Sequence, residues 1–198
     1  EAVVYLDNWI IGCKNTAITQ DELAPLLRED TVGIGMAAFY QCKEIESVKL
    51  PNVRYIGDYA FAECVNLLGY AYTVFSDEVE VIGDYAFAGC TLLDAFNFGT
   101  ALTRIETYAF KGCVRLSEAK FPETLKKIGT GAFNNSGIYN ASNGLVYADK
   151  WVVANKVGAG AVTVKDGTIG ISDYCFYQQW IDQVDLPDSL QIIGRAAF

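Results

Sequence analysis

The sequence contains no histidine, and this absence removes several kinds of active site at once. Histidine is the base in Ser-His-Asp and Cys-His nucleophile arrangements, and it is the commonest side-chain ligand for metal ions. Few catalytic schemes remain without it, and we assign no catalytic residue, no metal site and no cofactor.

Clusters of basic residues are also missing. The formal net charge is −9 and the sequence pI is about 4.5, so the chain repels the phosphates of nucleic acids and anionic membrane surfaces. Apolar runs extend over only a few residues, far fewer than a membrane-spanning helix needs. We therefore expect no nucleic-acid partner and no membrane insertion within this chain.

A leader-like segment is not visible, and the first residue is Glu1 rather than methionine. The last residue, Phe198, falls inside a phrase that recurs along the chain. We interpret the chain as part of a longer array, with any targeting signal outside it.

A short phrase that ends in phenylalanine recurs along the whole sequence. Its copies read GMAAF, IGDYAF, IGDYAF, IETYAF, IGTGAF, ISDYCF and IGRAAF. They end at Phe39, Phe61, Phe87, Phe110, Phe133, Phe176 and Phe198, in steps of 22, 26, 23, 23, 43 and 22 residues. A period of about 23 residues is typical of a solenoid, in which each coil buries a face only against its neighbours. We therefore predict a single solenoid over 1–198.

Each coil is expected to begin with a short strand. Alternating apolar residues are typical of strands, and they occur at 45–50, 67–72, 93–98, 116–121 and 181–186. Proline cannot donate to a ladder, and it follows three of these segments as Pro51, Pro122 and Pro187. A second extended segment, such as VRYIG at 53–57, then leads into a compact helical or 3₁₀ turn that carries Ala-Phe. Stacking such coils predicts a parallel sheet on one face.

The seven phenylalanines of the phrase are predicted to form a continuous inner column of the core. Identical coils place each ring over the previous one, and burying such a ring is worth about 1.5–3 kcal/mol. A row of aromatic side chains that faces a ligand is the alternative, which we disfavour because buried aromatics dominate protein cores.

The 43-residue step indicates an insertion. Residues 143–156 contain two apolar runs around Asp149 and Lys150, which predicts an inserted β-hairpin. Residues 161–165 supply a further strand.

The N-terminal residues 1–30 repeat this insertion. VYLDNWII matches VYADKWVV, with Trp9 equivalent to Trp151. A capping box of Thr19 and Glu22 then predicts a short helix at about 20–29.

Cysteine stands three residues after the phenylalanine in four copies, as Cys42, Cys64, Cys90 and Cys113. Coils about 5 Å apart bring these residues within range of a disulfide, although parallel inward side chains have poor bridging geometry. The spacing lacks the close pairs of a zinc knuckle. We expect free, buried thiols that pack as small hydrophobic groups, with a disulfide or a metal site as the alternatives.

Tyrosines two residues before the phenylalanine, Tyr59, Tyr85 and Tyr108, form a candidate aromatic strip. Tyrosine is favoured in binding surfaces. We favour the simpler interpretation, in which the rings cover the edge of the core and leave their hydroxyl groups in water.

The outward positions of the predicted strands are the best candidates for ligand binding, because the sheet of a solenoid is rigid and extended. An ordinary solvated face is the alternative. The candidate residues are Glu46, Lys49, Asp94, Asn97, Glu118, Lys120, Asp182 and Asp185.

The phrase IGDYAFAGC, the leucine-initiated segment after it and VxxIG before the next copy resemble the BspA-type leucine-rich repeats over essentially the whole chain. The VYADKWVV hairpin also occurs in proteins of that kind. The resemblance implies an α/β fold, a right-handed, horseshoe-like leucine-rich-repeat solenoid with a parallel sheet on one face and short helical turns on the other.

The same resemblance implies a bacterial protein that is secreted or located at the cell surface. It implies a non-catalytic module that binds a protein or a glycan through the sheet face, as in cell adhesion. A structural spacer within a larger surface protein is the alternative. A fragment of a carbohydrate-active enzyme is a more distant one, because paired carboxylates such as Asp182 and Asp185 need a cleft that an open sheet does not offer.

Overall fold

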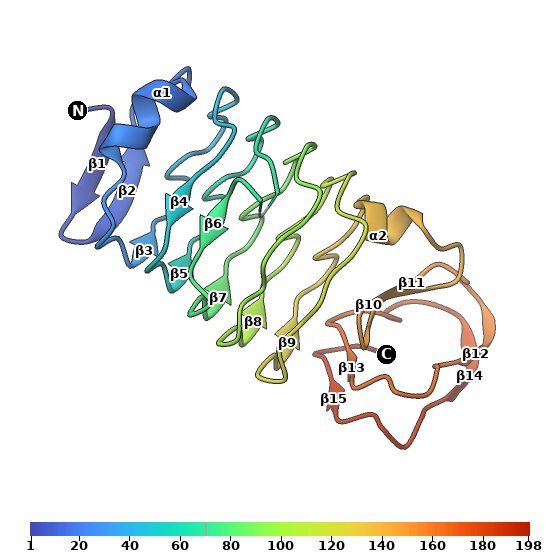
Figure 1. Cartoon of the computed structure of the whole chain (residues 1–198). Coiled ribbons are helices and arrows are strands. Elements are labelled where there is room, and N and C mark those ends of the chain that lie inside the picture. Colours follow the sequence, from blue (N-terminus) through green and yellow to red (C-terminus); the bar gives the residue numbers. More distant parts are fainter. Residues whose placement is uncertain (70) are drawn as a thin grey trace.

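The computed structural model describes residues 1–69 and 71–198. Tyr70, which falls within the strand predicted at 67–72, lies outside the described residues. The chain winds into coils that lie side by side, beginning at the N-terminal hairpin (Figure 1). The predicted solenoid is therefore confirmed.

The helices and hairpin strands lie in two segments, one at the start of the chain and one that interrupts the coils. They are β1 (Val3–Leu6), β2 (Trp9–Cys13), α1 (Gln20–Leu23), a 3₁₀ turn (Ala24–Leu26), α2 (Gly137–Asn140), β10 (Leu145–Ala148) and β11 (Trp151–Asn155). The strands of the coils are short. They are β3 (Gly33–Ile34), β4 (Lys49–Leu50), β5 (Tyr55–Ile56), β6 (Val74–Phe75), β7 (Val81–Ile82), β8 (Arg104–Ile105), β9 (Lys127–Ile128), β12 (Gly160–Thr163), β13 (Gly170–Ile171), β14 (Ile181–Asp185) and β15 (Ile192–Ile193).

The largest sheet in the described part of the chain has seven strands in the order β1-β2-β3-β5-β7-β8-β9. From β2 onward its neighbours are parallel, and one isoleucine of each coil shares a common register: Ile34, Ile56, Ile82, Ile105 and Ile128. Each of them stands five residues before its phenylalanine, and this constant spacing lets each coil bond to the next. The sheet is thus built from the second extended segment of the coil.

The parallel strands predicted in the first segment form only in part. β4 pairs with β6 and β12 pairs with β14, but β6 lies after the predicted segment 67–72, whose described residues contain no strand. The segments 93–98 and 116–121 contain no strand either. On this side Phe98 packs against Phe96 and Phe121, with ring centroids 5.0 and 4.9 Å apart. Successive coils of a solenoid are slightly rotated relative to one another. Neighbouring coils can therefore be close enough for backbone hydrogen bonds on one side of the solenoid and too far apart on the other.

The Ala-Phe phrase forms consecutive tight turns rather than the predicted helical turn. Ala60 N–H donates within the turn to Gly57 O at 3.2 Å, whereas Phe61 N–H donates to Ala86 O of the next coil at 2.7 Å. Tyr59, the third residue of the turn from Gly57 to Ala60, has a φ of 56°, and φ is positive at this position in every copy. A type II turn requires such a φ at its third residue. Alternate N–H groups are thereby directed at the neighbouring coil, which a helix would not allow.

The phenylalanine column is buried from Phe39 to Phe133, with successive ring centroids 5.2, 5.3, 5.3 and 5.5 Å apart. The prediction of one continuous column is wrong, because the second hairpin interrupts it. The stacking resumes with Phe176 and Phe198, whose centroids are 5.1 Å apart. Phe198, predicted as core, is 53% exposed, since no described coil covers its outer side.

The four cysteines of the predicted column are buried, and all six cysteines, which lie in the described part of the chain, are free thiols. Cys64 Sγ donates to Phe39 O at 3.0 Å, and the next two cysteines repeat this contact one coil further on. Burial raises the pKa of these thiols, that of Cys42 to about 12. The described residues contain no cluster of three metal-ligating side chains.

The two hairpins have the same geometry. β1 pairs with β2 and β10 with β11, each with an irregular register after Val4 or Val146. In the sheet, β2 pairs in parallel with β3, and β11 pairs in parallel with β13. Each hairpin thus begins a run of parallel strands.

The helix predicted at 20–29 is shorter than expected. The capping box of Thr19 and Glu22 is present and α1 begins at Gln20, but the α-helix ends at Leu23. Pro25 stands in the 3₁₀ turn that follows, because proline cannot supply the N–H that a continuing α-helix needs. Among the described residues, none of the helices has the length and apolar character needed to span a bilayer.

Candidate functional site on the sheet face

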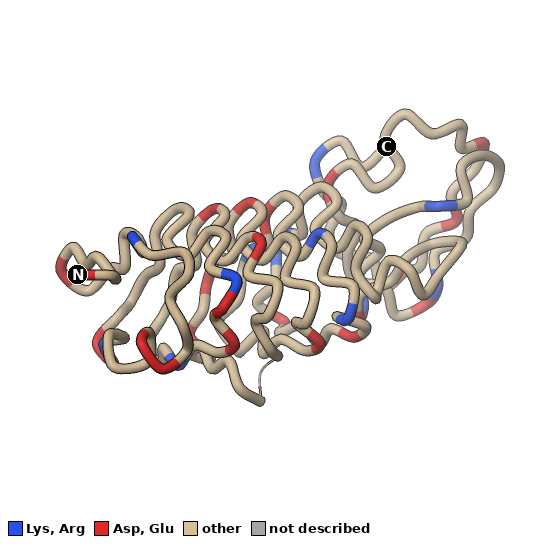
Figure 2. Tube along the Cα trace, turned by 90° about the horizontal axis from the view of Figure 1, so that it is seen from above, with Lys and Arg blue, Asp and Glu red and all other residues tan. Residues whose placement is uncertain are grey.

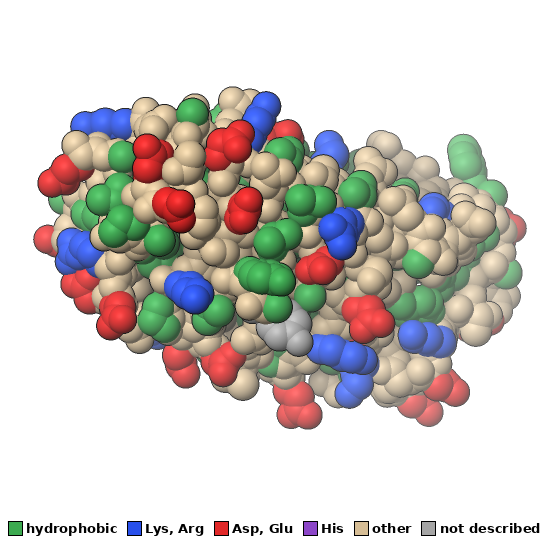
Figure 3. All heavy atoms as spheres, turned by 45° about the horizontal axis from the view of Figure 1, so that its top comes forward, with side chains coloured by type: hydrophobic (Ala, Val, Ile, Leu, Met, Phe, Trp, Pro, Cys, Tyr) green, Lys and Arg blue, Asp and Glu red, His purple; other side chains and the backbone are tan. Residues whose placement is uncertain are grey.

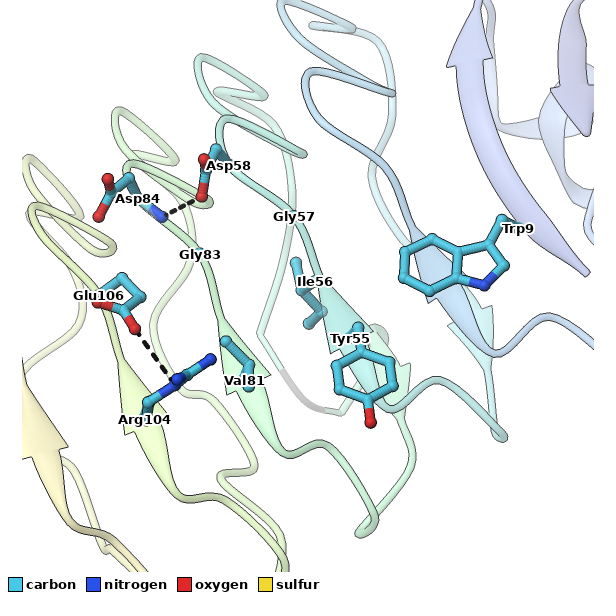
Figure 4. A pocket seen from close by; sticks show the side chains of 10 residues that line it. All are labelled: Trp9, Tyr55, Ile56, Gly57, Asp58, Val81, Gly83, Asp84, Arg104 and Glu106. Carbon is cyan, nitrogen blue, oxygen red and sulfur yellow. Dashed lines mark hydrogen bonds and ion pairs between the residues drawn. The ribbon is translucent and has the colours of Figure 1, made fainter. Parts of the chain in front are cut away.

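A shallow groove of about 370 Å³ crosses the outer face of the seven-stranded sheet. The sheet register brings Tyr55, Val81 and Arg104 side by side on neighbouring strands. Trp9 of β2 lies at one end, stacked on Tyr55 with ring centroids 6.0 Å apart and planes at 8° (Figure 4). The groove thus begins at an aromatic pair and ends at a charged side chain.

Glycines form the floor of the groove. A Cβ added at Gly57 would lie 2.8 Å from Ile34 O, and one added at Gly83 would lie 2.6 Å from Asp58 N. Real Cβ atoms do not approach backbone this closely, so the coils can pack at their observed spacing only if these residues lack a side chain. Packing against the preceding coil therefore requires glycine at positions 57 and 83.

Aspartates of the IGD phrase join neighbouring coils along the other edge of the groove. Asp84 N–H donates to Asp58 Oδ1 at 2.8 Å, and Thr107 N–H donates to Asp84 Oδ1 at the same distance. Arg195 N–H makes the equivalent bond to Asp173. Hydrogen bonds from backbone N–H groups to a carboxylate are charge-assisted and strong. The recurring Asp was the available sequence signal for this ladder, which sequence reasoning missed.

Ion pairs supply the charge of the groove. Arg104 Nε lies 3.3 Å from Glu106 Oε1, and Lys127 pairs with the same carboxylate. Beside them Arg54 pairs with Glu80, whose other oxygen accepts from Tyr55 Oη at 3.1 Å. The Glu80 carboxylate raises the pKa of the Arg54 guanidinium. These contacts fix the rims of the groove and leave the faces of Trp9 and Tyr55 partly open to solvent.

The predicted binding residues are exposed, but they do not lie on the seven-stranded sheet. Sequence reasoning placed the main sheet in the wrong segment of the coil, and it therefore missed Trp9, Tyr55 and Arg104. Asn97, Glu118 and Lys120 instead line a second groove of about 480 Å³, together with the half-buried ring of Phe96. The structure does not bring all eight predicted residues into one site; the others are Glu46, Lys49, Asp94, Asp182 and Asp185.

The tyrosine strip is a stack of partly covered rings. Tyr85 lies between Tyr59 and Tyr108, with ring centroids 4.8 and 5.0 Å away. Desolvation is the main reason why the pKa of Tyr85 is raised. Tyr174 departs from the strip and meets Tyr177 edge-on.

Charge is mixed along the rest of the molecule. Acidic and basic residues are interspersed along the coils (Figure 2), and the face in Figure 3 shows small groups of hydrophobic side chains separated by charged ones. The aromatic end of the sheet groove differs from its surroundings by two stacked rings beside the Arg54–Glu80 ion pair.

Coils joined by a parallel sheet, with one sheet face open, define a repeat solenoid. The chain belongs to the BspA type leucine rich repeat family, whose sequence model matches residues 26–142 and 155–198 in 6 copies. A comparison with curated protein sequences gave no match.

Solved structures of similar fold are bacterial leucine-rich repeat proteins. One from Bacteroides ovatus has a TM-score of 0.55 and 22% identity, over 87% of this chain and 50% of that one. A leucine rich cell surface protein from Faecalibacterium prausnitzii has a TM-score of 0.47 and 21% identity, over 86% of this chain and 56% of that one. The chain thus spans about half the length of these two proteins.

Proposed function

We propose that this chain is a non-catalytic protein-binding module, and that the groove on the seven-stranded sheet is its ligand site. The observation that carries the proposal is the stacked pair of Trp9 and Tyr55 beside the Arg54–Glu80 ion pair. Tryptophan, tyrosine and arginine are the residues most enriched among those that dominate binding energy in protein interfaces.

The shape of the groove favours a protein over a small molecule. Small ligands are usually held in concave sites that bury most of their surface, whereas this groove is shallow and crosses several strands. Strands spaced about 4.8 Å apart give it a length that suits an extended segment or a flat protein surface. Because every coil is bonded to the next, this surface is ordered before binding and little entropy is lost.

The proposal also covers where the module acts in the cell and which residues form it. We propose that the module acts at the cell surface or after secretion from a bacterium, and that residues 1–198 act as one array in which the hairpin segments 1–30 and 143–156 are structural insertions. Surface exposure is tested by labelling intact and lysed cells of the source organism with an antibody to the chain. Labelling that needs lysis contradicts this part of the proposal.

A second surface supports the same function. The groove around Phe96 combines an aromatic floor with Asn97, Glu118 and Lys120, so a protein or a glycan that bound there would contact three of the residues predicted from sequence. Substitutions in the two grooves distinguish the sites, since they lie on different segments of the coil.

The test is binding of the purified chain to a panel of host matrix proteins, bacterial surface proteins and glycans. We expect at least one saturable protein ligand whose affinity falls about tenfold or more with Tyr55→Ala or Arg104→Ala. Tyr72→Ala is the matched control, because Tyr72 is exposed outside both grooves. A full panel without a ligand favours the structural spacer, and a ligand that is indifferent to both Tyr55 and Arg104 contradicts the site.

A further inference from the structure

The hairpin that begins the chain and the hairpin in its middle are two copies of one element. Trp9 of the first corresponds to Trp151 of the second, and each begins the second strand of its hairpin. That strand ends four residues later, at Cys13 in the first copy and at Asn155 in the second. The two copies can therefore be compared position by position.

In the second copy the last residue of the hairpin strand binds the following coil through its side chain. Asn155 Nδ2 donates to Gln179 Oε1, and Gln179 Nε2 donates to Asn155 O at 3.2 Å. Gln179 stands three residues after Phe176. The same position after the first hairpin is Cys42, three residues after Phe39. The two positions that are in contact in the second copy are thus both cysteines in the first.

Cys13 and Cys42 are neighbours in the first copy as well. Cys13 packs on the core cluster that contains Cys42. Burial, the charge of Cys13 and a hydrogen bond between the two side chains together raise the pKa of the Cys42 thiol to about 12. Such a hydrogen bond requires the two sulfur atoms to lie close to each other. Both residues are free thiols in this structure.

Cys42 differs from the later cysteines of its column in what its thiol meets. The thiols of Cys64, Cys90 and Cys113 each donate to the carbonyl oxygen of the phenylalanine in the preceding coil, at 3.0 to 3.1 Å. Cys42 follows the first phenylalanine of the repeat, so the hairpin lies beside it instead of an earlier coil. Its thiol therefore meets Cys13 and not a carbonyl group.

We propose that Cys13 and Cys42 are an oxidisable pair, which forms a disulfide when the chain meets a small-molecule disulfide such as glutathione disulfide. The bond joins the end of β2 to the first coil and closes the loop 13–42, which contains α1 and β3. It fixes the first hairpin covalently at the place where the second hairpin is held by the side chains of Asn155 and Gln179. The inference goes beyond the proposed function and does not depend on it.

The disulfide forms in two thiol–disulfide exchange steps. Cys13 is only half-buried, so its sulfur attacks the reagent, forms a mixed disulfide and releases one molecule of reduced thiol. The sulfur of Cys42 then attacks the sulfur of Cys13 and releases the second molecule. The two cysteines lose two protons and two electrons in all, and the reagent gains them as two S–H groups.

The other four cysteines remain thiols in this reaction. Cys64, Cys90, Cys113 and Cys175 are buried, so the reagent reaches them only if the fold opens. The expected product therefore has one disulfide and four free thiols among its six cysteines.

Thiol titration of the folded chain before and after incubation with glutathione disulfide tests the proposal. We expect the number of free thiols to fall from six to four, and peptide mapping by mass spectrometry to link Cys13 to Cys42. Cys13→Ala should lose no thiol. Cys175→Ala is the matched control and should lose two thiols, as the wild-type chain does. Circular dichroism confirms that each variant is folded.

Cys42→Ala separates the two steps of the reaction. This variant lacks the thiol that attacks second, so Cys13 should remain joined to one glutathione unit, which reductant removes. In the wild-type chain the disulfide restricts the unfolded state, and the thermal midpoint should rise by about 5–10 °C on oxidation. The rise should be absent in Cys13→Ala.

Several results overturn the proposal. They are a wild-type thiol count that stays above four, a disulfide mapped to another pair of cysteines, an equal loss of thiols in Cys13→Ala, and a midpoint that does not rise on oxidation. None of them affects the proposed ligand site, because neither Cys13 nor Cys42 lines the groove on the sheet.

Discussion

Trp9 and Trp151 occupy the same position in two equivalent hairpins, and each ring lies against a glycine, Gly33 or Gly170. Trp151 is buried in the core, whereas Trp9 is half-buried at the end of the sheet groove. The difference comes from the coil that precedes the second hairpin. One local sequence thus yields a core residue in one place and a candidate binding residue in the other.

Phe87→Ala should destabilise the fold by about 3–5 kcal/mol, because it opens a cavity between two stacked rings in the middle of the column. Urea unfolding measures the change in unfolding free energy. Asp94→Ala, at an exposed position, should change it by less than about 0.5 kcal/mol. Equal effects of the two substitutions would contradict the assignment of Phe87 to the core and of Asp94 to the surface.

Gly83→Ala should be destabilising, although alanine usually restricts the unfolded chain and so favours folding. The new Cβ would lie 2.6 Å from Asp58 N and from Asp58 Oδ1, which forces neighbouring coils apart and costs about 1–3 kcal/mol. Gly144→Ala is the control, because its Cβ would meet only Ser142 Oγ at 4.0 Å. The thermal midpoint of Gly83→Ala should therefore lie clearly below that of Gly144→Ala. Similar midpoints would show that neighbouring coils can shift apart at little cost and would contradict the prediction.

Asp84→Ala should remove the hydrogen bond that Asp84 accepts from Thr107 N–H, and leave this N–H without its protein acceptor. The expected cost is about 1–3 kcal/mol. Hydrogen exchange should also become faster at the Thr107 amide. Asp182→Ala, on an exposed position of β14, is the control and should change neither quantity.

The unfolding free energy should fall as the pH rises from about 9 toward 12. Burial raises the pKa of Cys42 and of Cys175 to about 12 in the folded chain, whereas an unfolded cysteine ionises near its ordinary pKa of about 8.5. The stabilisation is thus complete below the pKa of the unfolded cysteine. Above that pKa, each buried thiol lowers the unfolding free energy by up to about 1.4 kcal/mol per pH unit. Denaturation in reductant at pH 7 and pH 10 measures the fall.

Cys175→Ala should show a smaller fall than the wild-type chain over the same interval, since one titrating thiol is removed. Equal falls would mean that the loss at high pH comes from other groups, such as tyrosine and lysine. The comparison therefore isolates the contribution of this buried thiol.

The period of the repeat could be read from sequence because every coil must place equivalent side chains at one depth. Phe61, Phe87 and Phe110 recur at nearly equal steps, and this recurrence predicted both their stacking and the burial of the cysteines that follow them. The hairpin at 145–155 was visible for a similar reason, since two apolar runs flank Asp149. The backbone of the Ala-Phe turn was not predictable in this way, because alanine and tyrosine do not ordinarily favour the positive φ that Ala37 and Tyr59 adopt.

The sheet groove was beyond sequence reasoning for a different reason. Trp9 and Tyr55 are 46 residues apart, and only the parallel register of β2, β3 and β5 brings them together. The choice between two extended segments in each coil decides which side chains face outward on the sheet. That choice depends on where neighbouring coils come close enough to bond.

The amino-acid sequence alone determined the repeating unit, its family and the residues of its inner column, because burial of identical side chains at identical positions leaves a periodic trace along the chain. The tertiary structure decided which segment forms the sheet and where the column of rings is interrupted. These properties depend on the spacing between coils and on the presence of a neighbour, and neither is a property of any single repeat.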